Sequence, residues 1–169
     1  MTIVQFAFAM VATAASAFLL LGTFYVLSLA RVHNLEILVQ EAKEEEPKSP
    51  CKIDDGVKGP YFFLEGLTST PIVKGPKSPF QPEQKELILI ANRLEHGGVL
   101  MSDAPDDRVK GELEQPVLRQ REPKPRDEEG LLNEAQVDHI KPQAKGGSNS
   151  YCNAMVVSQQ YNLDKRREA

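Results

Sequence analysis

Residues 135–165 read AQVDHIKPQAKGGSNSYCNAMVVSQQYNLDK, and this stretch decides the fold. Residues 135–140 alternate apolar and polar side chains, as a short half-buried strand does, and Pro142 ends that strand. A glycine-rich polar loop follows, and residues 153–157 form a second apolar run that is typical of a strand. Ser158 is well placed to cap a helix that begins after it. The predicted order is therefore strand, loop, strand and helix.

The same stretch carries the residues that suggest a chemistry. A helix packed across the strand pair would bring Asp138 and His139, at the end of the first strand, close to Asn162 in the helix. A carboxylate and an amide carbonyl are hard oxygen ligands for a divalent cation, and a neutral imidazole can accept a proton. The pattern indicates a metal-dependent phosphodiesterase site.

Residues 132–166 resemble the HNH endonucleases of the ββα-metal type. The matching positions are Asp138, His139, Ile140, Pro142, Gly146, Gly147, Asn153, Asn162 and Lys165. Asn162 replaces the last histidine of the motif, as in the HNN variants, and the pattern is similar to the HNH domain of the RNA-guided CRISPR effector. A wider stretch beginning at Asn92 is similar to HNH domains of bacterial polymorphic toxins. The cysteine knuckles of many HNH proteins are absent, so no structural zinc is expected.

The resemblance implies a role for each residue of the motif. His139 would be the general base that takes a proton from the attacking water. Asp138 and Asn162 would bind one divalent metal ion, Mg²⁺ or alternatively Mn²⁺. Asn153 would hold the loop that orients His139. Lys165 would contact the phosphate, although a solvated lysine is an equal alternative.

The overall charge limits how such a site could meet its substrate. Asp and Glu number 24 against 20 Lys and Arg, which gives a formal net charge of −4. This balance argues against the broad positive field of proteins that hold nucleic acid along an extended surface. Contact with DNA is therefore expected to be local, where a bound metal would offset Asp138.

The two cysteines, Cys51 and Cys152, do not form a CxxC pair. Four thiolate ligands for a structural zinc ion are therefore not present. A disulfide between them is left open, but we interpret them as two unrelated thiols, which a reducing cytosol would keep reduced.

The N-terminal region begins with a long apolar run. Ile3 to Ala30 contains no charged residue and exceeds the roughly 20 apolar residues that a helix needs to cross a bilayer. Residues 1–34 are therefore predicted to hold a single-pass transmembrane helix, with a cleaved signal peptide and a secreted product as the alternative. Basic residues flank only the C-terminal side, from Arg31 onward, which favours a cytoplasmic C-terminal domain.

Residues 35–81 are interpreted as a linker, with a short polar helix over residues 35–46 and a proline-rich tether after it. The tether contains one apolar island, Tyr61-Phe62-Phe63-Leu64. Docking of this island on the domain and a transient exposed patch are both open.

A folded domain is predicted over residues 82–169, starting with a helix over residues 84–94 that ends at His96-Gly97-Gly98. Val99-Leu100-Met101 and Val117-Leu118 are expected to form a loose antiparallel pair. Asp103, Asp106 and Asp107 lack the EF-hand pattern and are expected to form a solvated turn.

The sequence thus predicts an α+β protein in which a small ββα-metal (HNH) nuclease domain follows a transmembrane helix and a proline-rich tether. The predicted function is a membrane-anchored, metal-dependent endonuclease that hydrolyses DNA. One alternative is a delivered antibacterial nuclease toxin with an immunity protein as its partner. Another is a non-catalytic membrane adaptor that uses a degenerate HNH fold to bind nucleic acid.

Overall fold

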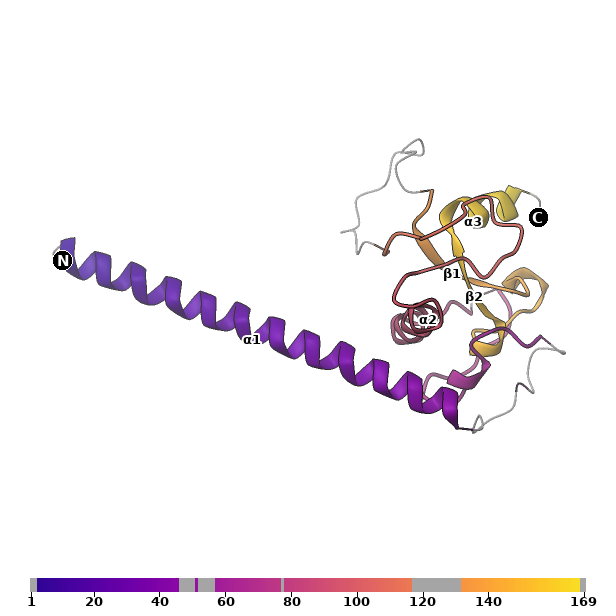
Figure 1. Cartoon of the computed structure of the whole chain (residues 1–169), viewed down its shortest axis with the longest axis horizontal. Helices are drawn as coiled ribbons and strands as arrows, with labels where there is room; N and C mark the ends of the chain where they lie inside the picture. Colours follow the sequence, from indigo (N-terminus) through magenta and orange to yellow (C-terminus); the bar gives the residue numbers. More distant parts are fainter. Residues whose placement is uncertain (1–2, 46–50, 52–56, 77, 117–131, 168–169) are drawn as a thin grey trace. The chain divides into compact units, whose positions relative to one another are not determined.

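The computed structural model describes residues 3–45, 51, 57–76, 78–116 and 132–167 (Figure 1). The chain divides into two compact units, Met1–Ile37 and Leu38–Ala169. The first unit consists of most of helix α1, and the second contains the sheet and the remaining helices. The candidate site lies entirely within the second unit.

Helix α1 runs without a break over Ile3–Glu44. It continues past the apolar run through the charged residues from Arg31 onward, and it includes most of the polar helix predicted over residues 35–46. Across the residues that the structure describes, no helix is both long enough and apolar enough to cross a membrane. The predicted transmembrane helix is therefore not supported. Val39 and Ala42, in the last turns of α1, are buried within the second unit.

A two-stranded antiparallel sheet forms the centre of the second unit. Strand β1, Ala135–His139, pairs with strand β2, Ala154–Ser158, so that Asp138 lies opposite Met155. Helix α3, Gln159–Arg167, follows β2 directly. The predicted order of strand, loop, strand and helix is confirmed.

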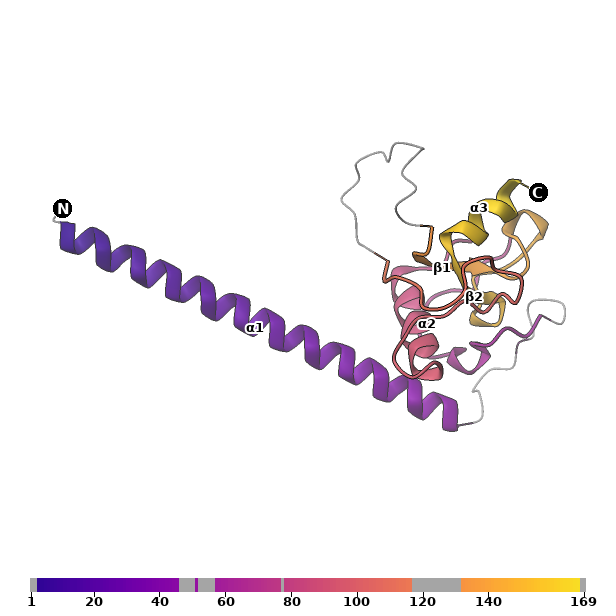
Figure 2. The ribbon, with the colours of Figure 1, turned by 45° about the horizontal axis from the view of Figure 1, so that its top comes forward.

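Helices pack on the sheet and leave β1 only partly buried at its centre. Helix α2, Pro82–Glu95, and helix α3 both contact the strands, and Figures 1 and 2 show them on opposite sides of the sheet. All five residues of β2 are buried. Met155 and Val157 pack with Tyr161 of α3, which explains why this strand is apolar nearly throughout instead of alternating.

The helix ends follow the local sequence signals. Ser158 caps α3, because its Oγ accepts a hydrogen bond of 3.0 Å from the Tyr161 backbone N–H. Helix α2 ends at Glu95 with His96 as its C-cap, and Gly97 then adopts a positive φ of 68°. The predicted helix over residues 84–94 is confirmed, with two further residues at its start and one at its end.

The segment interpreted as a tether is packed into the second unit over its described residues 57–76 and 78–81. Tyr61, Leu64 and Phe80 are buried, so docking is the alternative that the structure shows for the apolar island. Proline keeps this segment out of regular elements but does not prevent its apolar side chains from entering the core.

Two of the three aspartates expected in a solvated turn are instead structural anchors. Asp103 accepts hydrogen bonds from the Tyr61 hydroxyl at 2.7 Å and the Val156 backbone N–H at 2.6 Å. Burial raises the pKa of Asp103, although these hydrogen bonds act in the opposite direction. Leu100 pairs with Leu113, and the predicted partner Val117-Leu118 lies outside the described residues.

Asp107 anchors the junction between β2 and α3. Its side chain is buried and accepts hydrogen bonds from Ser158 N at 2.8 Å, Ser158 Oγ at 2.7 Å, Ser102 Oγ at 2.7 Å and Val109 N at 3.0 Å. Burial opposes ionisation, but these four donors together outweigh it and lower the pKa of Asp107. The Asp107 carboxylate thus accepts the hydrogen bond that the Ser158 N–H would otherwise make to a neighbouring strand.

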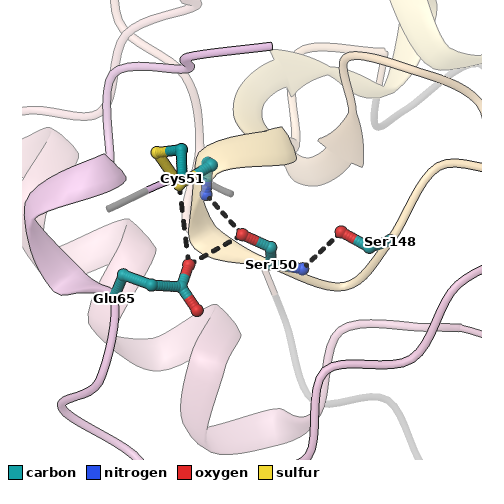
Figure 3. The surroundings of a disulfide bond; sticks show 5 residues. Cys51, Glu65, Ser148 and Ser150 are labelled. Atoms are coloured by element: carbon teal, nitrogen blue, oxygen red, sulfur yellow. Dashed lines mark hydrogen bonds between the residues drawn. A yellow bond between two sulfur atoms is a disulfide. The ribbon is translucent and has the colours of Figure 1, made fainter. Parts of the chain in front are cut away.

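A disulfide joins Cys51 to Cys152 (Figure 3), so the interpretation as two unrelated thiols is wrong. The residues are 101 positions apart in sequence, and residues 57–59 return to the segment that holds Cys152. In that return the Gly59 backbone N–H donates to Cys152 O at 2.7 Å. Glu65 lies beside the bond, with Oε2 at 3.7 Å from Cys152 Sγ.

Reduction of this disulfide is expected to lower the free energy of unfolding by about 2–5 kcal/mol, because a long loop is no longer closed in the unfolded chain. Urea unfolding with and without a reductant measures the change. The Cys51→Ser variant should lose its response to the reductant. An unchanged wild-type transition under reducing conditions would contradict the assigned bond.

Asp107→Asn is expected to lower the free energy of unfolding by about 2–3 kcal/mol, since an amide cannot accept from all four donors. Because folding lowers the pKa of Asp107, its contribution is present above the ordinary aspartate pKa of about 3.9 and is lost as the pH falls through the folded value. Unfolding curves measured from neutral to acidic pH should therefore converge for the two proteins. The exposed Glu112→Gln variant serves as the control and should match the wild type.

Candidate active site

A cavity of about 350 Å³ opens at the end of β1. Its lining includes Asp138 and His139 from β1, Asn162 and Lys165 from α3, Lys85 from α2 and Phe80. Four of the five predicted site residues therefore line one cavity. The fifth, Asn153, is fully buried behind it.

His139 is held by three neighbours and is only 7% exposed. Its Nε2 lies 3.0 Å from the Ser78 carbonyl oxygen and 3.3 Å from the Gln143 side-chain amide nitrogen. The Phe80 ring stacks on the imidazole, with the centroids 4.2 Å apart and the planes 25° apart.

The Ser78 contact decides which ring nitrogen of His139 carries the proton. A backbone carbonyl can only accept, so the 3.0 Å contact requires a proton on Nε2. The Gln143 contact is longer, and rotation of that amide by half a turn would present its oxygen to the same proton. The neutral ring then has its lone pair on Nδ1, which is the atom that can accept a proton from water.

Asn153 bridges the loop between the two strands. Its Oδ1 accepts from Lys141 N at 2.7 Å, and its Nδ2 donates to Lys141 O at 3.1 Å and to Ser148 O at 2.9 Å. The bridge leaves no room for a side chain at Gly147, where a Cβ would lie 1.9 Å from Lys141 O. Lys141 is two residues after His139, so the Asn153 amide fixes the course of the backbone directly after His139.

Asp138 and Lys165 form an ion pair at the cavity wall. Lys165 Nζ lies 2.8 Å from Asp138 Oδ2 and donates a second hydrogen bond of 2.5 Å to the His139 carbonyl oxygen. Both side chains are mostly buried. The ammonium thus ties α3 to the end of β1, and Asp138 already interacts with a cation.

The residues present fit a divalent ion of the Mg²⁺ type. Asp138 and Asn162 supply two hard oxygen ligands to one cavity, and Mg²⁺ is commonly held by one or two protein ligands together with water and phosphate oxygens. In the described part of the chain, no three His, Cys, Asp or Glu side chains gather as a metal cluster.

Several residues of the site carried no signal in the sequence. Ser78 acts through its backbone carbonyl, Phe80 through its ring, and both belong to the segment interpreted as a tether. Gln143 and Lys85 are polar residues in ordinary surface patterns. Ser78, Phe80 and Lys85 precede His139 by 54 to 61 residues, and Gln143 lies in the loop after it. No periodic pattern in the sequence links these residues to His139.

Comparison with known proteins agrees with this geometry. Residues 127–169 match the family model of the HNH endonucleases. This segment is similar to the HNH endonuclease family and covers about a quarter of the chain. Searches of curated proteins and of solved structures give no match. The HNH segment includes β1, β2 and α3 with all five predicted site residues, whereas α2, Ser78 and Phe80 lie outside it.

The match supports nuclease activity in general. It supports a nucleic acid as the substrate, and a divalent metal is usual in this family. The roles of the five individual site residues remain predictions. The contacts described above show where their side chains lie.

Proposed function

We propose that the chain is a metal-dependent endonuclease that hydrolyses phosphodiester bonds of DNA. In this proposal His139 is the general base, and Asp138 and Asn162 hold one divalent ion, Mg²⁺ or Mn²⁺. The observation that carries the proposal is the pairing of His139 Nε2 with the Ser78 carbonyl, in the same cavity as two oxygen ligands.

His139 would take a proton from the attacking water at Nδ1. The Ser78 carbonyl remains hydrogen-bonded to Nε2–H and stabilises the imidazolium that results. A divalent ion bound by Asp138 and Asn162 would neutralise the scissile phosphate and stabilise the departing 3′ oxygen. Asn153 would keep His139 in place through the Lys141 backbone.

The local charge of the cavity supports a phosphate as the ligand. Lys85 and Lys165 line it together with only one acid, Asp138. Although the whole chain has a net charge of −4, the cavity itself is at least neutral before any metal binds. Short-range contacts with a few phosphates need no long-range positive field.

The full-length protein is expected to nick or cut DNA when Mg²⁺ or Mn²⁺ is present and to lose this activity when a chelator is added. His139→Ala should lower the rate by about 10²–10⁴-fold, which is the usual contribution of a general base. Plasmid DNA, linear duplex DNA and RNA are incubated in parallel and the products are separated by electrophoresis.

His96→Ala is the matched control, because His96 is exposed at the end of α2 and does not line the cavity. Equal cleavage by wild type and His139→Ala would overturn the assigned base. Cleavage of RNA alone would overturn the choice of DNA while leaving the nuclease activity intact.

We propose as a second candidate the delivered antibacterial nuclease toxin, which would leave the reducing cytosol of the cell that makes it on its way to another cell. The observation that favours it is the disulfide between Cys51 and Cys152, since disulfides persist in oxidising compartments and are rare in the cytosol. This candidate keeps the same chemistry and changes only where the enzyme works.

The second candidate predicts that Cys51 and Cys152 are oxidised in the cells that make or receive the protein. Acid quenching, alkylation of thiols and mass spectrometry measure the oxidised fraction. A copy confined to the cytosol by its expression host provides the reduced comparison. A fully reduced pair in the native cells, with intact nuclease activity, would exclude this candidate.

A further inference from the structure

We propose that a segment outside the HNH segment positions the general base, through the Ser78 carbonyl and the Phe80 ring. The segment comprises residues 71–76 and 78–80 and is called the strap. The proposal rests on the proposed function, because it assigns the strap a role in orienting His139 for proton transfer. Ser78 and Phe80 are positioning residues in this proposal.

The strap is fixed to the loop that follows Gly146. Val73 N–H donates to Asn149 Oδ1 at 2.6 Å, and Asn149 N–H donates to Val73 O at 3.1 Å. Gly75 N–H donates to Gly147 O at 3.1 Å. These bonds run like a short antiparallel pairing, with Lys74 opposite Ser148. The strap therefore has a defined register against the loop.

Ser78 is the point where the strap turns towards the base. Its Oγ donates to Gly75 O at 2.6 Å, and the same oxygen lies 3.1 Å from Gly147 O. Ser78 is only 1% exposed. These contacts hold its own carbonyl where it accepts the Nε2 proton of His139.

The loop beneath the strap is in turn fixed to the strand that carries the base. Asn153 Nδ2 donates to Ser148 O and to Lys141 O, and Ile140 N–H donates to Asn153 O at 2.9 Å. His139 and its acceptor Ser78 are thus attached to one loop from two directions. A shift of either one would break bonds on the other side of the loop.

The ring of His139 has one orientation that satisfies these contacts. Rotating the imidazole by half a turn about its Cβ–Cγ bond would move Nε2 away from the Ser78 carbonyl and leave that buried oxygen without its donor. Phe80 covers one ring face and is 4% exposed. The strap therefore selects both the ring plane and the Nε2–H tautomer, and the lone pair of the neutral ring stays on Nδ1.

The test measures the tautomer of His139 and the nuclease rate on the full-length protein with Phe80→Leu and Phe80→Tyr. Long-range proton–nitrogen NMR spectra of the imidazole distinguish the two tautomers, and His139→Ala assigns the signal among the three histidines. Leu113→Ala is the matched control, since Leu113 is equally buried but does not line the cavity. Urea unfolding is recorded for every variant.

The wild type should show the Nε2–H tautomer. Phe80→Leu should give a mixture of tautomers and lower kcat by about 10- to 100-fold, with KM changed by less than about twofold. Phe80→Tyr, which keeps the aromatic ring, should restore both properties. Leu113→Ala should lower stability without changing the tautomer.

The opposite tautomer in the wild type would overturn the proposal, because the Ser78 carbonyl would then not accept the ring proton. A Phe80→Leu protein with an unchanged tautomer would also overturn it, whatever its rate, because the loss would then be one of stability alone. If the protein proves to have no nuclease activity, the proposed function fails, yet the spectra still show whether the strap orients the ring.

Discussion

The buried side-chain amide of Asn153 is the interaction on which the site depends. One amide satisfies both polar backbone groups of Lys141 and the carbonyl of Ser148. An aspartate of the same size could not donate to the two carbonyls, and a leucine could satisfy none of the three groups. A neutral amide makes these bonds without adding a charge to a buried loop. The same bonds set the end of β1, the course of the loop and the surface against which the strap packs.

Two buried carboxylates of this protein have a structural role. Asp103 and Asp107 connect residues from separate parts of the chain to β2, and they replace the strand partners that a two-stranded sheet lacks. Their pKa values shift in opposite directions, because burial dominates at Asp103 and hydrogen bonds dominate at Asp107. Burial also raises the pKa of Tyr61, which donates to Asp103. A small domain thus gains cross-links from polar groups where its apolar core is limited.

The positive charge of Lys165 offsets the negative charge of Asp138 in the candidate site. By pairing with Asp138 and with the His139 carbonyl, it neutralises the acid and fixes α3 to β1 at the same time. A divalent ion that binds Asp138 must compete with this ammonium. The charges that a ligand in this cavity would meet are those within a few ångströms rather than the sum over the chain.

The sequence by itself determined the local elements. Alternation over residues 135–140, the Ser158 cap and the glycines after α2 act over a few residues, and each led to the observed strand or helix end. The ordered motif from Asp138 to Lys165 likewise indicated which side chains share a cavity, since one hairpin and one helix place them. Only the tertiary structure decided the disulfide, the anchoring role of Asp103 and Asp107, and the contact of Ser78 and Phe80 with His139. These join residues about 50 to 100 positions apart, and such contacts leave no periodic trace in the sequence because they depend on how the proline-rich segment folds back onto the sheet.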